Sequence, residues 1–205
     1  MPRRTRAQTE ETHQRLMAAA IETFCDKGVA RTTLDDVARR AGMTRGAVYW
    51  HFADKTALLR QILHQQPLPL ECLNAQGDLH QDCARMTRAV LATTCTSPHR
   101  QIVTILTQRA EWDYAEDVVR RRILLARKRF MAFLEQMLCG AQSRGELPGL
   151  LGEDAVGHWV AAIQSAVSGV VFESLLLPAR QRQLRIVQTL QLLLMPLTSG
   201  SPAMR

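Results

Sequence analysis

Several chemical signatures are absent from this sequence of 205 residues. Its five cysteines are odd in number, widely spread and form no CxxC pair, which argues against a zinc site or a dithiol redox motif. We expect them to be reduced packing residues. The six histidines show no metal-ligand spacing and lie beside no recognisable Ser or Cys nucleophile. We therefore expect no metal, no cofactor and no enzyme active site.

Long apolar segments are also absent. The N-terminus opens with arginines instead of the apolar region of a secretory signal, and no run of 18 apolar residues occurs. In the most apolar stretch, residues 155–171, polar side chains such as His158 and Gln164 favour a buried helix over a membrane span. We expect a cytoplasmic protein with no membrane partner.

The composition that remains is that of an ordinary globular protein with a basic bias. Hydrophobic residues make up 46% of the chain and charged residues 22%. The formal net charge is +7, and +4 of it lies in the first 60 residues, which hold 11 basic and 7 acidic side chains. A positive charge of this size favours an anionic partner such as nucleic acid or a membrane surface.

Apolar residues recur with helical spacing along most of the chain, and alternating strand patterns are nearly absent, so we predict an all-α fold of about nine helices. Turn formers such as Gly77-Asp78 and Ser97-Pro98 separate later helices at roughly 79–96, 99–110, 115–143, 153–176 and 180–195, followed by a short tail from Pro196. We predict a first domain over 1–58 and a second over 59–205. A basic run at 120–129 (Arg120, Arg121, Arg122, Arg127, Lys128 and Arg129) is interpreted as a solvated helix face.

Residues 32–55, TTLDDVARRAGMTRGAVYWHFADK, contain the most specific pattern. Thr33 can cap a helix that begins at Leu34, and Asp36 stands at the capping-box position. Gly42 suits a left-handed end to this helix, and Thr44 can cap a second one. Ala38 and Val48 would form the shared core. The pattern predicts a helix-turn-helix, the alternative being an ordinary helical hairpin.

The second of these helices carries two residues that are unfavourable within the helix itself. Arg45 places a cation at the positive end of the macrodipole, and Gly46 lowers helix propensity. Both are explained if this helix enters the major groove, where arginine can pair with guanine. We predict base contacts from Arg45, Ala47 and Trp50, and phosphate contacts from Tyr49, His51 and Lys55. Alternatively, Trp50 belongs to the core and His51 only caps the helix.

The segment from Leu16 to Leu59, which includes AAIETFCDKGVARTTLDDVARRAGMTRGAVYWHFADKTALL, resembles the DNA-binding domain of TetR-family transcriptional regulators. The WHF at 50–52 is similar to that of AcrR-like multidrug-efflux repressors, and weaker similarity extends through Gln108 to Trp112, RGELP and SGVVFESLLLP. The resemblance implies a helical homodimer that binds double-stranded operator DNA through its first three helices and dimerises through its last two. The implied DNA contacts are Thr33, Thr44, Arg45, Gly46, Ala47, Tyr49, Trp50, His51 and Lys55.

One region departs from this family pattern, and the N-terminal arginines resemble a feature of only some members. The family's fourth helix runs unbroken between the domains, but here Pro67 and Pro69 should break or kink it. Arg3, Arg4 and Arg6 resemble the basic arms that some members lay against DNA, and a solubilising tail is an equal alternative.

The second domain offers components for binding a small lipophilic effector. Such a site needs apolar walls and a few polar groups. Glu71 and Glu111 would favour a cationic compound, or they are surface charges. For the aromatic side chains, plain core packing is the favoured alternative. The candidate ligand residues are Glu71, Gln108, Glu111, Trp112, Phe130, Trp159, Gln164, Ser168 and Phe172.

The leading hypothesis is a ligand-responsive repressor of a multidrug efflux system. It would bind a palindromic operator as a dimer and be released by a lipophilic compound, with a cationic one as the expected class. The apolar helix at 155–172 and the next helix would form the dimer contact. The alternatives are a non-specific architectural DNA-binding protein, which would not need a large apolar second domain, and an enzyme on a helical scaffold.

Overall fold

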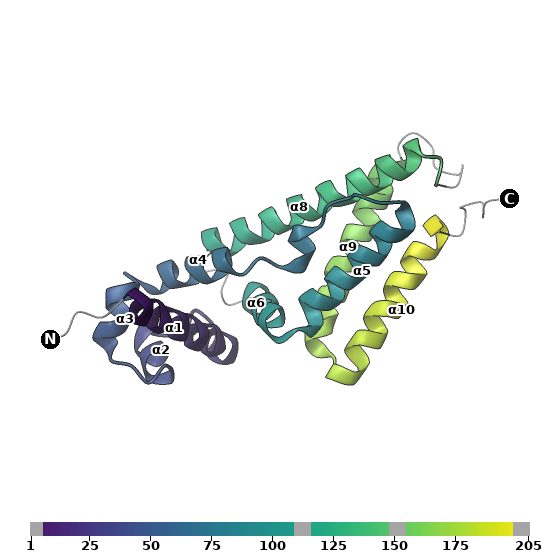
Figure 1. The fold of residues 1–205 in the computed structure, drawn as a ribbon. Helices are drawn as coiled ribbons and strands as arrows, with labels where there is room; N and C mark the ends of the chain where they lie inside the picture. The colour runs from purple at the N-terminus through teal and green to yellow at the C-terminus, as the bar shows by residue number, and fades with distance from the viewer. Residues whose placement is uncertain (1–5, 109–115, 148–154, 199–205) are drawn as a thin grey trace. The chain divides into compact units, whose positions relative to one another are not determined.

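A computed structural model describes residues 6–108, 116–147 and 155–198. Within these ranges the chain forms nine α-helices and one short 3-10 helix, and no strand (Figure 1). The helices are α1 (Arg6–Lys27), α2 (Leu34–Arg40), α3 (Arg45–His51), α4 (Lys55–Gln65), η1 (Pro69–Cys72), α5 (Leu79–Cys95), α6 (Ser97–Thr107), α8 (Glu116–Ser143), α9 (Ala155–Leu176) and α10 (Ala179–Thr198). The predicted all-α fold is confirmed.

The chain divides into two compact units. The first comprises Met1–Pro67 and Gln101–Ile123, and the second comprises Leu68–Arg100 and Leu124–Arg205. The first unit therefore extends beyond residue 58 and includes a later segment, because chain segments that are distant in sequence pack together. The functional division at residue 58 stays a prediction.

The core of the first unit is formed by α1 to α4, which include the helix-turn-helix. α1 packs against α2 and α4, and α2 packs against α3. The fully buried side chains include Leu16 and Phe24 of α1, Val37 of α2, Val48 of α3 and Leu58 of α4. Because each of these short helices presents only one apolar face, none would be stable alone. Packing against the longer α1 holds α2 and α3 in place.

α4 ends where the prolines predict. Its last residue is Gln65, and Pro69 opens η1, so the helix does not continue through this segment. The carbonyl groups left at its end are satisfied from a distant part of the chain. Arg122 of α8 donates from Nε to the carbonyl of Leu63 at 3.1 Å and from Nη2 to that of Gln66 at 3.4 Å. A guanidinium thus caps the interrupted helix.

The second unit is a helical bundle with its own core. α5, α9 and α10 pack pairwise and run side by side in Figure 1. Apolar side chains from α5, α8, α9 and α10 meet in one cluster that includes Met86, Leu134, Ile163 and Leu190, each fully excluded from solvent. The helical spacing of these residues is what the sequence predicts.

α9 is buried on one face only, which corrects the expectation of a buried helix. Val160, Ile163, Val167, Val170 and Ser174 point into the unit. By length and composition α9 could cross a membrane, yet only 28% of its most apolar 18-residue window is buried within the chain. The opposite face is exposed, since the described helices of the chain do not cover it. It consists largely of small and apolar residues: Gly157, Ala161, Ala162, Ser165, Ser168, Gly169, Phe172 and Leu176.

α10 continues to Thr198 and includes Pro196, although a tail was expected from this residue. Proline at 196 removes the hydrogen bond to the carbonyl of Leu192. The side chain of Leu192 is 70% exposed, so water can reach that carbonyl and the last turn is tolerated. At its other end α10 is joined to α9 by buried Arg182, whose Nε donates to the Ser174 carbonyl at 2.8 Å.

The cysteines are only partly the packing residues that we expected. All five are free thiols, but Cys72, Cys95 and Cys139 are exposed and Cys25 is half-buried. Only Cys83 is buried, and burial raises the pKa of its thiol to about 12.

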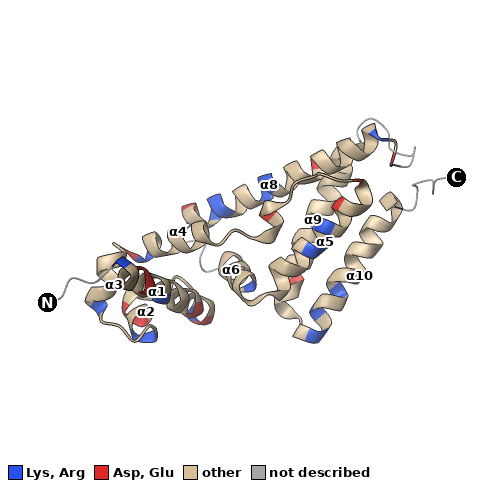
Figure 2. Ribbon diagram, in the orientation of Figure 1, with Lys and Arg blue, Asp and Glu red and all other residues tan. Residues whose placement is uncertain are grey.

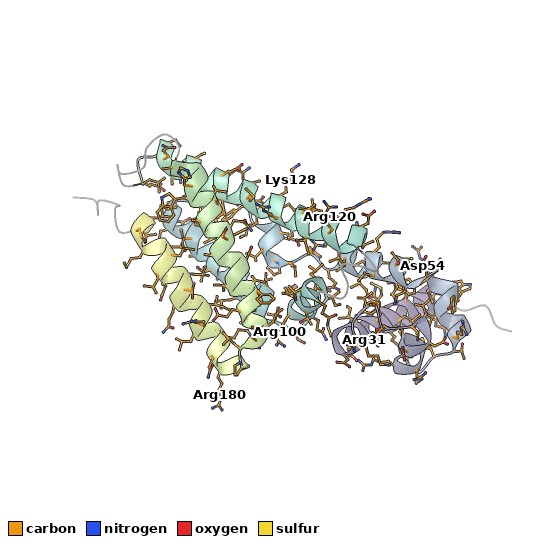
Figure 3. The ribbon with its side chains drawn as sticks, turned by 180° about the vertical axis from the view of Figure 1, so that it is seen from behind. Arg31, Asp54, Arg100, Arg120, Lys128 and Arg180 are labelled. Atoms are coloured by element: carbon orange, nitrogen blue, oxygen red, sulfur yellow. The ribbon has the colours of Figure 1, made fainter. Side chains whose placement is uncertain are left out.

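The basic run on α8 is mostly a solvated face, as predicted. Five of its six cations are exposed, and Figure 3 shows Arg120 and Lys128 extending away from the helix. Figure 2 shows the same helix carrying several basic positions. Arg122 is the exception, because its side chain turns inward to cap α4.

Candidate nucleic-acid interface

The entry to α2 is fixed by a complete capping box. The Thr33 hydroxyl accepts from the Asp36 N–H at 3.1 Å, and the Thr33 N–H donates to the Asp36 carboxylate at 3.0 Å. Lys27 of α1 binds the same carboxylate at 2.8 Å. The hydrogen bond from Lys27, followed by those from Thr33, holds the pKa of Asp36 well below its ordinary value of 3.8. The predicted capping box is confirmed.

This arrangement bears on the role expected for Thr33. Its hydroxyl also donates to Asp36, at 2.8 Å, so both functions of the hydroxyl are used within the protein. Thr44, by contrast, accepts from the Ala47 N–H at 3.3 Å to cap α3. The Thr44 side chain makes no further hydrogen bond within the described residues and keeps its O–H for an external acceptor. The two hydroxyls therefore differ in their hydrogen bonds, and the DNA contacts of both threonines stay predictions.

The turn between α2 and α3 follows the sequence pattern. Gly42 adopts a φ of 65°, a left-handed conformation that other residues rarely adopt. Ala38 and Val48 are buried, at 3% and 0% exposure, where the two helices cross. These observations confirm the helix-turn-helix and reject an ordinary hairpin as the explanation of the segment.

α3 presents an outer face that the protein does not use for its own packing. Tyr49 is 46% exposed and Trp50 is 72% exposed, which rejects the alternative of Trp50 as a core residue. Arg45 and Gly46 are exposed and Ala47 is half-buried. A Cβ added at Gly46 would meet no atom within 4 Å, so intramolecular packing does not require glycine there. A partner that approaches the backbone closely would require it.

Arg45 is held by two neighbours. Its Nε lies 3.2 Å from Oδ1 of Asp35 on α2, and its Nη2 donates to the Tyr49 hydroxyl at 3.4 Å. The guanidinium carbon also lies 5.2 Å from the centre of the Tyr49 ring, within cation–π range. The hydrogen bond to Tyr49 and then the charge of Asp35 raise the pKa of Arg45 above its ordinary value. Sequence analysis had not predicted a role for Asp35.

His51 forms part of an aromatic cluster at the end of α3. Its ring is half-buried, meets Trp50 edge-on at 4.7 Å and lies 5.6 Å from the ring of His13 on α1. His13 in turn contacts Gln61 of α4 at 3.0 Å and the Phe52 ring at 5.2 Å. The cluster ties α3 to α1 and α4. A phosphate contact by His51 stays a prediction.

Lys55 directs its ammonium group to backbone carbonyls of the protein, and its phosphate contact stays a prediction. Its Nζ donates to the backbone carbonyls of Val29, Ala30 and Thr32 at 2.6, 2.9 and 2.7 Å. An ammonium group has three N–H donors, and these three carbonyls use all of them. Lys55 therefore fastens the start of α4 to the loop between α1 and α2. The sequence could not reveal this, because the partners are backbone atoms at least 23 positions away.

The candidate ligand residues differ in their surroundings, and each is described within its own unit. In the second unit, Glu71 is buried and lies 3.9 Å from the Arg129 guanidinium, so its charge is already offset by a cation of the protein. Phe130 stacks on Phe133 in the core at 6.2 Å, as the plain-core alternative expects. Trp159 is half-buried against the same core.

The remaining candidates are Gln108, Gln164, Phe172, Glu111 and Trp112. Gln108 belongs to the first unit and donates to the Cys25 carbonyl at 3.3 Å. Gln164 bonds to Ser168 at 2.8 Å along the surface of α9, and Phe172 is 56% exposed on the uncovered face of that helix. Glu111 and Trp112 lie outside the described residues. A ligand site formed by these residues stays a prediction.

A groove of about 910 Å³ lies between α5 and α10 of the second unit. Its lining includes Ala84, Arg88, Arg185, Leu192 and Met195, and none of the candidate ligand residues takes part. Among the described residues, no group of three or more His, Cys, Asp or Glu side chains is placed to hold a metal ion.

Comparison with known proteins places this geometry in context. Residues 16–62 match the family of bacterial regulatory proteins described as the tetR family. The chain is 34% identical over 189 residues to the HTH-type transcriptional regulator SrpR of Pseudomonas putida, covering 90% of this chain and 84% of that protein. The structure of NalD, the secondary repressor of the MexAB-OprM multidrug efflux pump in Pseudomonas aeruginosa, superposes with a TM-score of 0.73 at 28% identity, covering 94% and 98% of the two chains. SmeT in complex with triclosan gives a TM-score of 0.73 at 25% identity over 90% of each chain.

Proposed function

The chain belongs to the TetR family of bacterial regulatory proteins, and from this premise we propose that it is a homodimeric, ligand-released repressor of a multidrug efflux system. As a TetR-family transcriptional regulator it is not an enzyme. Its partner is operator DNA, and this partner places the protein in the cytoplasm.

The observation that carries the proposal is the outer face of α3. Arg45, Tyr49 and Trp50 stand exposed on a seven-residue helix, with Gly46 between them and open space above its backbone. A guanidinium, a phenol and an indole can each contact base edges or phosphates. Their joint exposure on one helix face therefore favours a DNA-binding role for this face. We propose that α3 lies in the major groove, with Arg45 as the base-reading side chain and Thr44 and Tyr49 on phosphates.

The proposed dimer interface is the uncovered face of α9 together with α10. Gly157 and Gly169 are exposed on this face, and an added Cβ at either would meet no atom within 4 Å. Each glycine destabilises a helix by roughly 1 kcal/mol relative to alanine. Packing within the described residues does not require glycine at either position. Leu184 and Leu192 of α10 are 60% and 70% exposed. A second copy packed on these helices would cover both features about a two-fold axis.

The operator follows from this symmetry. Two α3 helices related by a two-fold axis would enter successive major grooves about 34–36 Å apart, so the operator should be an inverted repeat. The effector is proposed to be lipophilic, as triclosan is in the SmeT complex. Because Arg129 offsets Glu71, this carboxylate gives no reason to prefer a cation over a neutral compound.

The test has two parts. The wild-type protein is first used to select duplexes from a random library, and its affinity for the selected and for unselected DNA is then measured at one salt concentration. We expect a ratio of at least about 10³, as specific regulators show. A ratio near one would favour the architectural alternative instead.

The effector is tested by calorimetry with triclosan and with dodecyltrimethylammonium, a lipophilic cation. Linkage is reciprocal: the factor by which a compound lowers the affinity for DNA equals the factor by which DNA lowers the affinity for the compound. A compound that releases DNA must therefore bind the free protein more tightly than the DNA complex. Tight binding with no change in DNA affinity would reject ligand release.

A further inference from the structure

Asp35 is placed to influence how Arg45 reads DNA. It lies in the first turn of α2, whereas Arg45 is the first residue of α3, and the two side chains meet across the helix-turn-helix. Arg45 is 68% exposed and Asp35 is 47% exposed. A pair this accessible adds little to folding stability. Its contribution must be sought in what it does to the arginine.

Within the described residues, the contacts involve the Nε and Nη2 side of the Arg45 guanidinium and do not involve Nη1. Asp35 lies nearest to Nε, and the Tyr49 hydroxyl accepts from Nη2. Nη1 makes no hydrogen bond with any described residue. Nη1 and the second hydrogen of Nη2 together form the end-on edge of the planar guanidinium. Two parallel N–H groups on one edge are what the O6 and N7 acceptors of guanine require.

Among the described residues, the charged partner of Asp35 is Arg45. The Oδ1 of Asp35 is shielded from solvent and accepts no hydrogen bond from the described residues, so the guanidinium charge is its compensation. The neighbouring Asp36 differs, because its carboxylate accepts the capping-box hydrogen bond and pairs with Lys27. The two consecutive acids therefore have separate roles, one closing α2 and one facing the arginine.

We propose that Asp35 is a positioning residue for base recognition: together with Tyr49 it holds the Arg45 guanidinium by its Nε and Nη2 side and presents the Nη1–Nη2 edge to a guanine. This inference rests on the proposed operator binding and adds a specificity determinant to it. An arginine that is already oriented loses less side-chain freedom on binding. The gain applies only at the base pair that Arg45 reads.

A competing role would have the opposite signature. If Asp35 only drew Arg45 away from DNA and repelled phosphates, its removal would strengthen binding to every sequence. Any loss of negative charge near DNA produces such a uniform gain. The ratio of affinities for two duplexes that differ by one base pair cancels the uniform effect, so this ratio is the quantity to measure.

The experiment uses the full-length protein and a duplex that the wild type selects from a random library. Each position of this duplex is replaced in turn, and the base pair at which Arg45→Ala loses discrimination is identified. Discrimination there is then measured for Asp35→Asn and Tyr49→Phe. Glu22→Gln is the matched control, since it removes one exposed carboxylate of the first unit that makes no contact with Arg45.

We expect the wild type to prefer guanine at this position by about 5- to 150-fold. Asp35→Asn should lower the preference about 3- to 10-fold, Tyr49→Phe by a smaller factor, and Glu22→Gln not at all. In an Arg45→Ala background, Asp35→Asn should have no further effect on it, because the two residues act as a unit. Asp35→Glu, which keeps the charge, should recover part of the preference.

Unchanged discrimination in Asp35→Asn, with a uniform gain in affinity, would overturn the inference and identify a simple repulsive charge. Equal losses at all base pairs would also overturn it, since they would indicate a disturbed fold. If the wild type selects no sequence, the proposed function itself fails. The two failures are therefore distinguishable.

Discussion

The Nζ of Lys55, the first residue of α4, lies 2.7 Å from the carbonyl oxygen of Thr32, which immediately precedes the cap of α2. This hydrogen bond and its two companions join the end of the helix-turn-helix to its beginning. The loop that leads into Thr33 is thereby fastened to the start of α4. Lys55 would thus serve DNA binding through geometry instead of through its charge.

Replacing Lys55 with Met tests this role, since Met keeps the aliphatic stem and removes all three donors. We expect a loss of about 1–3 kcal/mol in the free energy of unfolding, because three carbonyls lose charge-assisted partners. Urea denaturation measures it. Operator affinity should fall without a change in the slope of log K against log salt. A slope lower by about one would show instead that the ammonium group contacts a phosphate in the complex.

The Asp36 carboxylate should make stability depend on pH in one direction. Its pKa is lower in the folded protein than its ordinary value of 3.8, so it stabilises the fold fully above pH 3.8 and progressively less as pH falls toward the folded pKa. We expect Asp36→Asn to be less stable than the wild type by about 1 kcal/mol at pH 7 and pH 5. The difference should shrink below pH 4.

Unfolding free energies at pH 7, 5 and 3 provide the measurement, with Glu22→Gln as the control for loss of an exposed carboxylate. A gap between Asp36→Asn and the wild type that stays constant down to pH 3 would contradict the lowered pKa. A gap that grows on acidification would mean that the pKa of Asp36 is raised, not lowered, in the folded protein.

Local sequence signals predicted the helix-turn-helix down to individual residues. Thr33, Asp36 and Gly42 act on neighbours within a few positions, so their roles follow from spacing alone. The break before Pro67 followed for the same reason. Such interactions need no knowledge of how distant segments meet.

The contacts that the sequence did not predict have a different origin. Lys55 and Arg122 were interpreted from their charge, yet both donate to backbone carbonyls that are distant in sequence. Phe130 and Phe172 have equal apolar character but lie in a core and on an uncovered face. Only the three-dimensional arrangement of helices separates these cases, because every amphipathic helix has residues of one type on more than one face.

Arg122 offers a comparison with an adjacent arginine. Arg122→Ala should destabilise the protein by about 1–2 kcal/mol, because the Leu63 and Gln66 carbonyls at the end of α4 lose their donor. Arg121→Ala should change stability by less than about 0.5 kcal/mol. Its only described ion pair, with Asp117, is about 80% exposed at both ends. Equal urea midpoints for the two variants would refute the capping role of Arg122.

The uncovered face of α9 leads to the last prediction, which concerns the proposed dimer. Ala162 is exposed on this face, between Gly157 and Gly169. Ala162→Glu would place a carboxylate without a partner in a dry contact, and burying an unpaired charge is strongly unfavourable. We expect at least a 100-fold weaker dimer, monomers in light scattering at micromolar concentration, and unchanged helical circular dichroism. Operator binding should weaken with it, since one α3 cannot span an inverted repeat. Ala132→Glu, at an exposed alanine of α8, is the matched control and should remain dimeric. A dimeric Ala162→Glu variant with normal operator affinity would exclude this face of α9 from the interface.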